Sequence, residues 1–206
     1  MKKKIVVAIC GASGSIYGLR LLKALLSMPV SIYLIISKTG FTVLEHETNY
    51  KPRDSDKDLA HFLKAYGITF HKDAHLQIFD ETNFFAPPAS GSFVHHGMVI
   101  APCSMKTLGA IASGIADNLI HRAADVCLKE KRPLIMLTRE TPLSHVHLKN
   151  MLAATVSGAT IMPPCPGFYF KPKTIEELVD SIIARVLAHL NFEHNLIRQW
   201  GEPNIV

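Results

Sequence analysis

The N-terminal segment combines a strand, a glycine turn and a helix, and this unit constrains the fold more than any other part of the chain. Lys3 to Cys10 is a β-branched, apolar run that predicts a buried strand, and Ile16 to Ser27 repeats apolar residues at helical spacing. Between them lies the turn Gly11-Ala12-Ser13-Gly14-Ser15. A helix that begins after such a turn presents unpaired backbone N–H groups and a positive dipole end, which can hold a phosphate. The turn can equally be a plain tight connection, since it matches neither the G-x-G-x-x-G fingerprint nor a lysine-bearing phosphate loop.

Strand-like and helix-like segments alternate along the rest of the chain. Further strands are expected at 31–36, 76–79, 98–101, 134–137 and 160–162. Further helices are expected at 39–48, 56–66, 119–130, 144–156 and 175–190. This alternation predicts one α/β domain whose mostly parallel sheet carries helices on both faces.

Ligands of such sheets bind at the carboxyl ends of the strands. That rule indicates four stretches of this chain as the binding edge. They are Gly11–Ser15, Ser37, Pro102–Thr107 and Thr138–Glu140.

Composition narrows the function classes. The 206 residues are 48% hydrophobic and 19% charged, enough for one substantial core. No apolar run approaches the ~20 residues of a membrane span, and no signal peptide is evident. The four cysteines are widely spaced without a C-x-x-C pair, which favours reduced thiols in a cytosolic protein. The net charge of +5 comes from scattered basic residues, so small phosphorylated ligands are favoured over nucleic acid, and the histidines form no metal-ligand set.

Some charged residues occupy positions that solvation alone does not explain. Glu47 falls on the apolar side of its helix. Two interpretations are open: it carries a proton in a reaction, or it is a helix-end acid bonded to neighbouring backbone. Arg122 and Lys129 share a helix face with Asp125 between them. This face is either part of a functional site or an ordinary solvated face with ion pairs. Arg185 lies at the margin of an apolar stripe, where we expect its guanidinium to be half enclosed. It then belongs either to a functional site or to a structural ion pair. The segment 130–132 is expected to face solvent.

An ordered set of motifs resembles the UbiX-type flavin prenyltransferases. These motifs are GASGS with Tyr17-Gly18, Glu47-Thr48, PPASGS, PCSMKTL, Arg122-Ala123-Ala124-Asp125, Leu128-Lys129-Glu130, Arg139-Glu140-Thr141-Pro142-Leu143 and PGFY. They run in order from Ile5 to about Trp200 at compatible spacings. The resemblance implies a Rossmann-like (flavodoxin-like) FMN-binding domain at 1–190, and a tail at 191–206 that packs on a neighbouring subunit. It also implies a homo-oligomer, a dodecamer by resemblance.

The resemblance assigns roles to individual positions. The implied FMN-binding residues are Gly11, Ala12, Ser13, Ser37, Ser104, Met105, Lys106, Thr107, Arg122 and Arg139. The implied substrate-binding residues are Ala89, Ser90, Lys129, Arg139, Tyr169 and Arg185, around a prenyl phosphate at a site shared between subunits. The implied catalytic residues are Ser15, Glu47, Glu140, Lys129 and Trp200.

The implied activity is a metal-independent prenyl transfer in a cytoplasmic enzyme that binds neither membrane nor nucleic acid. Dimethylallyl monophosphate would alkylate reduced FMN at N5 and C6, and the prenylated FMN would pass to a UbiD-type decarboxylase, one of which serves ubiquinone biosynthesis. One alternative is a cysteine-decarboxylase-like flavoprotein, but the P-x-M-N-type motif of that class reads Pro102-Cys103-Ser104-Met105 here, without asparagine. Another is a non-catalytic flavin binder or carrier, which has no reason to keep Lys129, Glu140, Tyr169 and Arg185 together.

Overall fold

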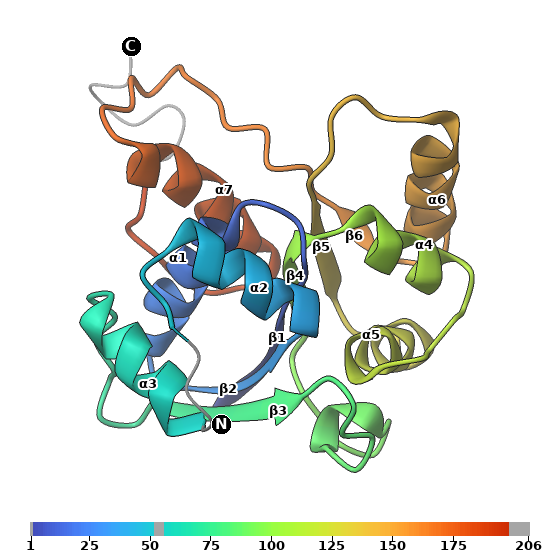
Figure 1. Cartoon of the computed structure of the whole chain (residues 1–206), viewed down its shortest axis with the longest axis horizontal. Helices are drawn as coiled ribbons and strands as arrows, with labels where there is room; N and C mark the ends of the chain where they lie inside the picture. The colour runs from blue at the N-terminus through green and yellow to red at the C-terminus, as the bar shows by residue number, and fades with distance from the viewer. Residues whose placement is uncertain (1, 52–55, 198–206) are drawn as a thin grey trace.

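A six-stranded parallel sheet forms the centre of the computed structural model, which describes residues 2–51 and 56–197 (Figure 1). Its strands are β1 (Lys3–Ile9), β2 (Val30–Ile36), β3 (His75–Asp80), β4 (Met98–Cys103), β5 (Leu134–Thr138) and β6 (Thr160–Ile161). The α-helices are α1 (Ser15–Leu26), α2 (Lys38–Glu47), α3 (Asp56–Ala65), α4 (Met105–Ala112), α5 (Leu119–Lys129), α6 (His145–Val156) and α7 (Ile175–His189). A short 3₁₀ turn, η1 (Pro87–Ala89), precedes β4.

The strand order places a topological switch at the middle of the sheet. The order is β3-β2-β1-β4-β5-β6, and every described strand pair is parallel. The chain therefore winds outward from β1 to β3 on one side and from β4 to β6 on the other. In open parallel sheets the loops after the two strands at such a switch separate and leave a crevice for a ligand. Here those loops follow β1 and β4.

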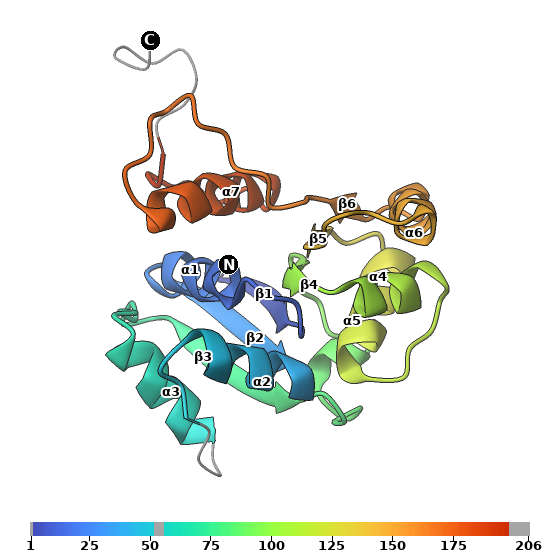
Figure 2. The same ribbon diagram turned by 45° about the horizontal axis from the view of Figure 1, so that its top comes forward.

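Both faces of the sheet are buried, and side-chain alternation divides the core in two. In β1, Ile5, Val7 and Ile9 pack on one face with α1, α2, α3 and α7. Val6, Ala8 and Cys10 pack on the other with α4, α5 and the segment before β4. Helix α7 packs on α1, which Figure 2 shows from the side, and its apolar side chains join the same core as Val99 and Ile135. Among residues 2–51 and 56–197, no helix has the length and apolar character needed to cross a membrane.

The predicted α/β fold with a parallel sheet is confirmed, and the expected strands and helices lie within a few residues of their observed bounds. Helix α4 was not predicted as a helix. Its sequence, MKTLGAIA, contains a glycine and two alanines and is too short to show a clear apolar period. It begins because the Ser104 hydroxyl accepts a hydrogen bond from Thr107 N (3.3 Å), a normal N-cap.

A mostly buried ion pair joins α1 to α7 and yields a stability prediction. Arg20 Nε donates to Asp180 Oδ1 at 2.7 Å, its Nη2 pairs with Oδ2, and the two side chains are 18% and 12% exposed. We expect Arg20→Met to lower the free energy of unfolding by about 3 kcal/mol, because it leaves the Asp180 carboxylate buried without its cation. Urea titration at fixed protein concentration measures this. Lys23→Met on the same helix is the control, and equal stability of the two variants would contradict the prediction.

Candidate active site

In the loop after β1, the backbone lies close to the start of α2. A Cβ atom on Gly11 would lie 2.5 Å from Thr39 Oγ1, so only glycine fits between β1 and the start of α2. Gly14 has φ 109°, in the left-handed region, and immediately precedes α1. The loop therefore brings backbone to the sheet edge and leaves little room for larger residues.

Glu47, from the end of α2, occupies the N-terminus of α1. Its Oε1 accepts from Gly14 N at 2.9 Å and its Oε2 from Ser15 N at 2.7 Å. Partial burial raises the pKa of Glu47, but hydrogen bonds from Ser13, Gly14 and Ser15 outweigh it, so the pKa lies below the usual 4.5. The helix-end N–H groups that could have held a phosphate are thus taken at Gly14 and Ser15 by this carboxylate. Phosphate binding at those two groups is therefore not what the structure indicates.

The Ser15 hydroxyl lies beside the same carboxylate. Ser15 is fully buried, and its hydroxyl lies close enough to Glu47 to help lower the pKa of that carboxyl, but its Oγ makes no hydrogen bond of good geometry among the described residues. The Thr138 hydroxyl at the end of β5 is buried and unpartnered in the same sense. Buried hydroxyls need partners, so two such groups at one sheet edge indicate a polar ligand there.

The neighbouring strand ends contribute the other predicted flavin-site residues. The Ser37 hydroxyl caps α2 by accepting from Gly40 N at 3.0 Å, and Ser104 caps α4. Arg139 follows β5, and its Nε donates to the Ser13 carbonyl at 3.1 Å. Gly11, Ala12, Ser13, Ser37, Ser104, Thr107 and Arg139 thus gather at the carboxyl ends of β1, β2, β4 and β5. Met105 and Lys106 form the first turn of α4 at the same edge.

A neutral thiol lies beneath this edge. Cys10 is buried and accepts a hydrogen bond from Thr107 Oγ1 at 3.3 Å. Burial raises the pKa of Cys10 to about 11 and that of Cys103 above its usual range. These thiols are therefore protonated near neutral pH and are poor nucleophiles. No group of residues suited to holding a metal ion occurs in the described part of the chain.

A second group of predicted site residues lies at η1 and α5. Arg122 Nε donates to the Ala89 carbonyl at 3.0 Å, and its Nη1 contacts Asp125 at 2.6 Å. The ion-pair alternative for Arg122 and Asp125 is therefore observed, and these contacts tie Arg122 to the η1 turn. Lys129, at the end of the same helix, pairs instead with Glu130 at 2.6 Å. The Ser90 hydroxyl is exposed and shares a hydrogen bond with Ser92 at 2.8 Å.

The remaining predicted residues lie on exposed surface. Glu140 is exposed after β5, and its Oε1 accepts from Thr141 N at 3.1 Å. Tyr169, in the segment joining β6 to α7, is 53% exposed and contacts Phe170 edge-on. Arg185 is exposed on α7, so the prediction that its guanidinium is half enclosed is wrong within one chain. The apolar residues of α7 pack toward α1, and the guanidinium lies outside this contact. Trp200 lies outside the described residues.

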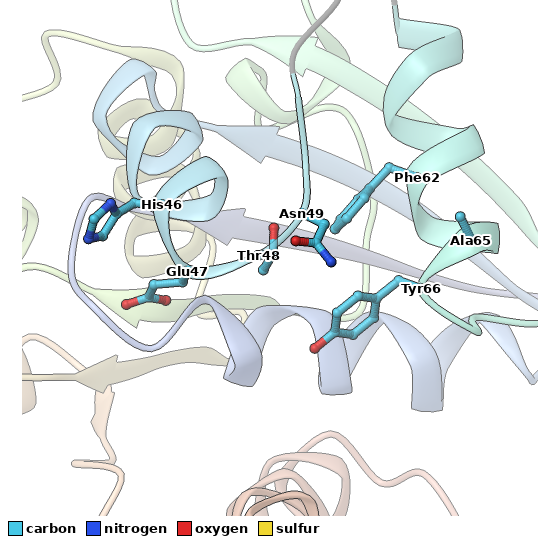
Figure 3. Close-up of a pocket in the computed structure, with 7 residues that line it drawn as sticks. All are labelled: His46, Glu47, Thr48, Asn49, Phe62, Ala65 and Tyr66. Carbon is cyan, nitrogen blue, oxygen red and sulfur yellow. The ribbon is translucent and has the colours of Figure 1, made fainter.

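An open cavity of about 600 Å³ lies between α2 and α3 and reaches Glu47 (Figure 3). It is lined by His46, Glu47, Thr48, Asn49, Phe62, Ala65 and Tyr66. In Figure 3 the Glu47 carboxylate points away from the Phe62 and Tyr66 rings toward the start of α1. Glu47 therefore contacts both this cavity and the loop after β1.

Two residues near the site were missed from the sequence. Glu81 follows β3, and its carboxylate accepts from Lys38 N at 2.6 Å and from Asn118 Nδ2 at 3.3 Å, joining the starts of α2 and α5. Its place just after a strand was the available signal. Arg132, expected to face solvent, is half buried and donates to two backbone carbonyls. No local pattern marks that contact, because its partners lie in a distant segment.

Comparison with known proteins agrees with this geometry. Residues 1–187 match the Flavoprotein family. The flavin prenyltransferase UbiX of Pseudomonas aeruginosa is 42% identical over 99% of this chain and 97% of its own. A crystal structure of AnUbiX (PadA1) in complex with FMN and dimethylallyl pyrophosphate has a TM-score of 0.85 at 40% identity, covering 97% of this chain and 98% of that chain.

A second solved structure adds an assembly. It is described as a dodecameric FMN-dependent UbiX-like decarboxylase from Escherichia coli O157:H7, with a TM-score of 0.82 at 42% identity over 96% of this chain and 98% of that chain. Identity at this level over nearly the full length goes well beyond a shared fold. The chain belongs to the Flavoprotein family and, within it, to the UbiX-type flavin prenyltransferases.

Proposed function

We propose that this enzyme transfers the dimethylallyl group of dimethylallyl monophosphate to N5 and C6 of reduced FMN. The observation that carries the proposal is the Glu47 carboxylate held beside Ser15 at the edge where the predicted flavin residues gather. A carboxylate held in place by two backbone N–H groups can also serve as the base that the second bond to the flavin requires. The names of the relatives, and the flavin and prenyl diphosphate bound by AnUbiX, support the same reading.

The strand-end residues suit a flavin nucleotide. Two buried, unpartnered hydroxyls offer hydrogen bonds, Gly11 allows close approach of backbone, and Arg139 uses only its Nε in the described contact with Ser13. Residues 11–13, Ser37, 104–107 and Arg139 would hold FMN, with Arg139 facing its phosphate. When bound in reduced form, FMN supplies the nucleophilic N5 and C6.

Lys129, Tyr169 and Arg185 would stabilise the leaving phosphate, with Ala89 and Ser90 beside it. The allylic C–O bond breaks with its electron pair remaining on phosphate, and Glu140 would supply a proton to that oxygen. Lys129 and Arg185 lie on different helices, α5 and α7, with no contact between them among the described residues. We therefore infer that a site of this kind combines Lys129 of one subunit with Tyr169 and Arg185 of another. Trp200 would line the prenyl group.

Glu47 would act as the base when the second bond forms. Its lowered pKa keeps it ionised at neutral pH, and the Ser15 hydroxyl beside it can relay a proton. The two backbone N–H groups orient the carboxylate before the reaction begins. The proton lost from C6 then has a defined acceptor.

We also propose a homo-oligomer, a dodecamer as in the Escherichia coli relative. Helix α6 buries only Ala154, while Val146, Leu148, Leu152 and Val156 are 51–80% exposed. So much apolar surface on one helix is typical of an interface, and we assign it to a second copy of this chain. We expect Leu152→Glu to shift the protein toward smaller assemblies in sedimentation velocity. Lys149→Glu on the same helix is the control, and an unchanged assembly in Leu152→Glu would contradict the assignment.

The product, prenylated FMN, would pass to a UbiD-type decarboxylase in the cytoplasm. Parallel assays with dimethylallyl monophosphate and diphosphate test the donor, and conversion of reduced FMN tests the reaction. Transfer with neither donor would favour a non-catalytic flavin carrier. The cysteine-decarboxylase alternative predicts thiol oxidation instead, with oxidised FMN as the electron acceptor.

A further inference from the structure

Two arginines from opposite ends of α5 hold the carbonyls of the 89–93 segment. Arg122 donates to Ala89 O at 3.0 Å from the first turn of the helix. Arg132, just beyond its last turn, donates through Nη2 to Gly91 O at 2.6 Å and through Nη1 to Phe93 O at 2.8 Å. Three alternate carbonyls of one loop are thereby fixed to one helix.

The end of α5 directs Arg132 toward this loop. Lys131 adopts φ 54°, and Arg132 N donates to Cys127 O at 2.8 Å, which closes the helix and turns the chain back. The charged and titratable groups around the guanidinium are Glu130, His95 and Cys127. Burial lowers the pKa of His95 to about 4 and raises that of Cys127 to about 12, so both are neutral near pH 7.

The middle of the loop depends most on Arg132. Phe93 is anchored by its ring, 4.7 Å from that of Tyr33, and Ala89 is held by Arg122. Ser90 and Ser92 are exposed, and Gly91 lies between them. A Cβ on Gly91 would lie 2.8 Å from Lys129 Nζ and 2.3 Å from Glu130 Oε1, so the loop backbone lies directly against the Lys129–Glu130 pair.

We propose that Arg132 is a positioning residue for the donor-phosphate subsite: it holds Gly91 against Lys129 so that Ser90 and the Lys129 ammonium face the phosphate as one unit. This rests on the proposed function, because it takes Ser90 and Lys129 as phosphate contacts. Arg132 itself touches neither substrate. A bidentate contact to two carbonyls requires the planar guanidinium, which a lysine ammonium cannot replace.

The test compares Arg132→Met and Arg132→Lys in the full-length oligomer, with Lys131→Met as the matched control. Steady-state transfer is measured with reduced FMN and dimethylallyl monophosphate, varying each in turn. We expect Arg132→Met to raise the KM for the prenyl donor about tenfold, which is less than the ~10²-fold that a 1 Å misplacement can cost, and to leave the KM for FMN within about twofold. Arg132→Lys should fall between wild type and Arg132→Met, and Lys131→Met should match wild type. Amide hydrogen exchange should rise at residues 90–92 in Arg132→Met.

The outcomes separate the two proposals. An active wild type with an unchanged donor KM in Arg132→Met, or with equal rises in both KM values, would overturn the positioning role alone. A wild type that transfers no prenyl group would overturn the proposed function and the donor subsite with it. Faster exchange at 90–92 together with the selective rise in donor KM supports both.

Discussion

Replacing Glu47 with glutamine is expected to slow formation of prenylated FMN by about 10²–10⁴-fold, the usual range for loss of a general base. Glu47 Oε2 accepts from both Gly14 N (3.1 Å) and Ser15 N (2.7 Å), so the single oxygen of glutamine, placed there, can keep both contacts and the α1 start should stay in place. It cannot take up a proton. FMN binding, measured by fluorescence titration, should therefore change little while the rate falls.

The control is Glu45→Gln, since Glu45 is exposed on the same helix and has no assigned role. The pH dependence provides a second check. Because the pKa of Glu47 is lowered, the wild-type rate should fall on the acid side only below the usual glutamate value of 4.5. The stability contributed by Glu47 has the same sign: it is present above the unfolded-state pKa and lost as pH falls through the folded-state pKa. A Glu47→Gln variant with wild-type rate would remove Glu47 from the mechanism.

Lys129→Met should lower kcat/KM for the prenyl donor by about 10²–10³-fold, as expected when one charged group is removed from a developing anion. The methionine keeps much of the side-chain length and removes the ammonium that now pairs with Glu130. FMN affinity should stay near wild type, because Lys129 lies with the η1 loop rather than with the strand-end residues. Steady-state kinetics with Lys131→Met as control measures the effect, and an undiminished kcat/KM would contradict it.

Mixing two inactive variants tests whether the site is shared. Lys129→Met and Arg185→Met subunits, co-expressed, would form some sites with both wild-type residues if these come from different chains. Random assembly would then restore about a quarter of wild-type activity. If both residues serve the site from one chain, the mixture stays as inactive as its components.

The features that could be predicted from the sequence are those that depend on residue patterns within a short segment. Alternating strand and helix segments predicted the parallel α/β fold, which is confirmed, and the ends of the predicted strands brought together the residues expected to bind the ligand. Glu47 was singled out from its expected place on the apolar side of its helix. Its contacts confirm the helix-end acid bonded to backbone, and the role of proton carrier stays a prediction.

Helix α4 was missed because its sequence is short, whereas the other failures come from contacts between segments distant in sequence. Glu47 reaches across 33 positions to Gly14 and takes a helix end that the turn alone offered to phosphate. Arg132 looked solvent-exposed within a basic run, yet it binds Gly91 O, 41 positions away. Arg185 was expected to be half enclosed beside the apolar stripe of its own helix. That stripe packs against α1, and Arg185 remains exposed outside the contact. Periodicity describes which face of a helix is apolar, and it does not say which neighbour covers its margins.

Mass spectrometry of the flavin extracted after anaerobic incubation with reduced FMN and dimethylallyl monophosphate tests the proposed prenyl transfer directly. We predict that FMN gains the mass of one five-carbon prenyl unit, that oxidised FMN does not react, and that Glu47→Gln forms this product far more slowly. A flavin that binds to the protein but keeps its original mass with both the monophosphate and the diphosphate would contradict the proposed transfer.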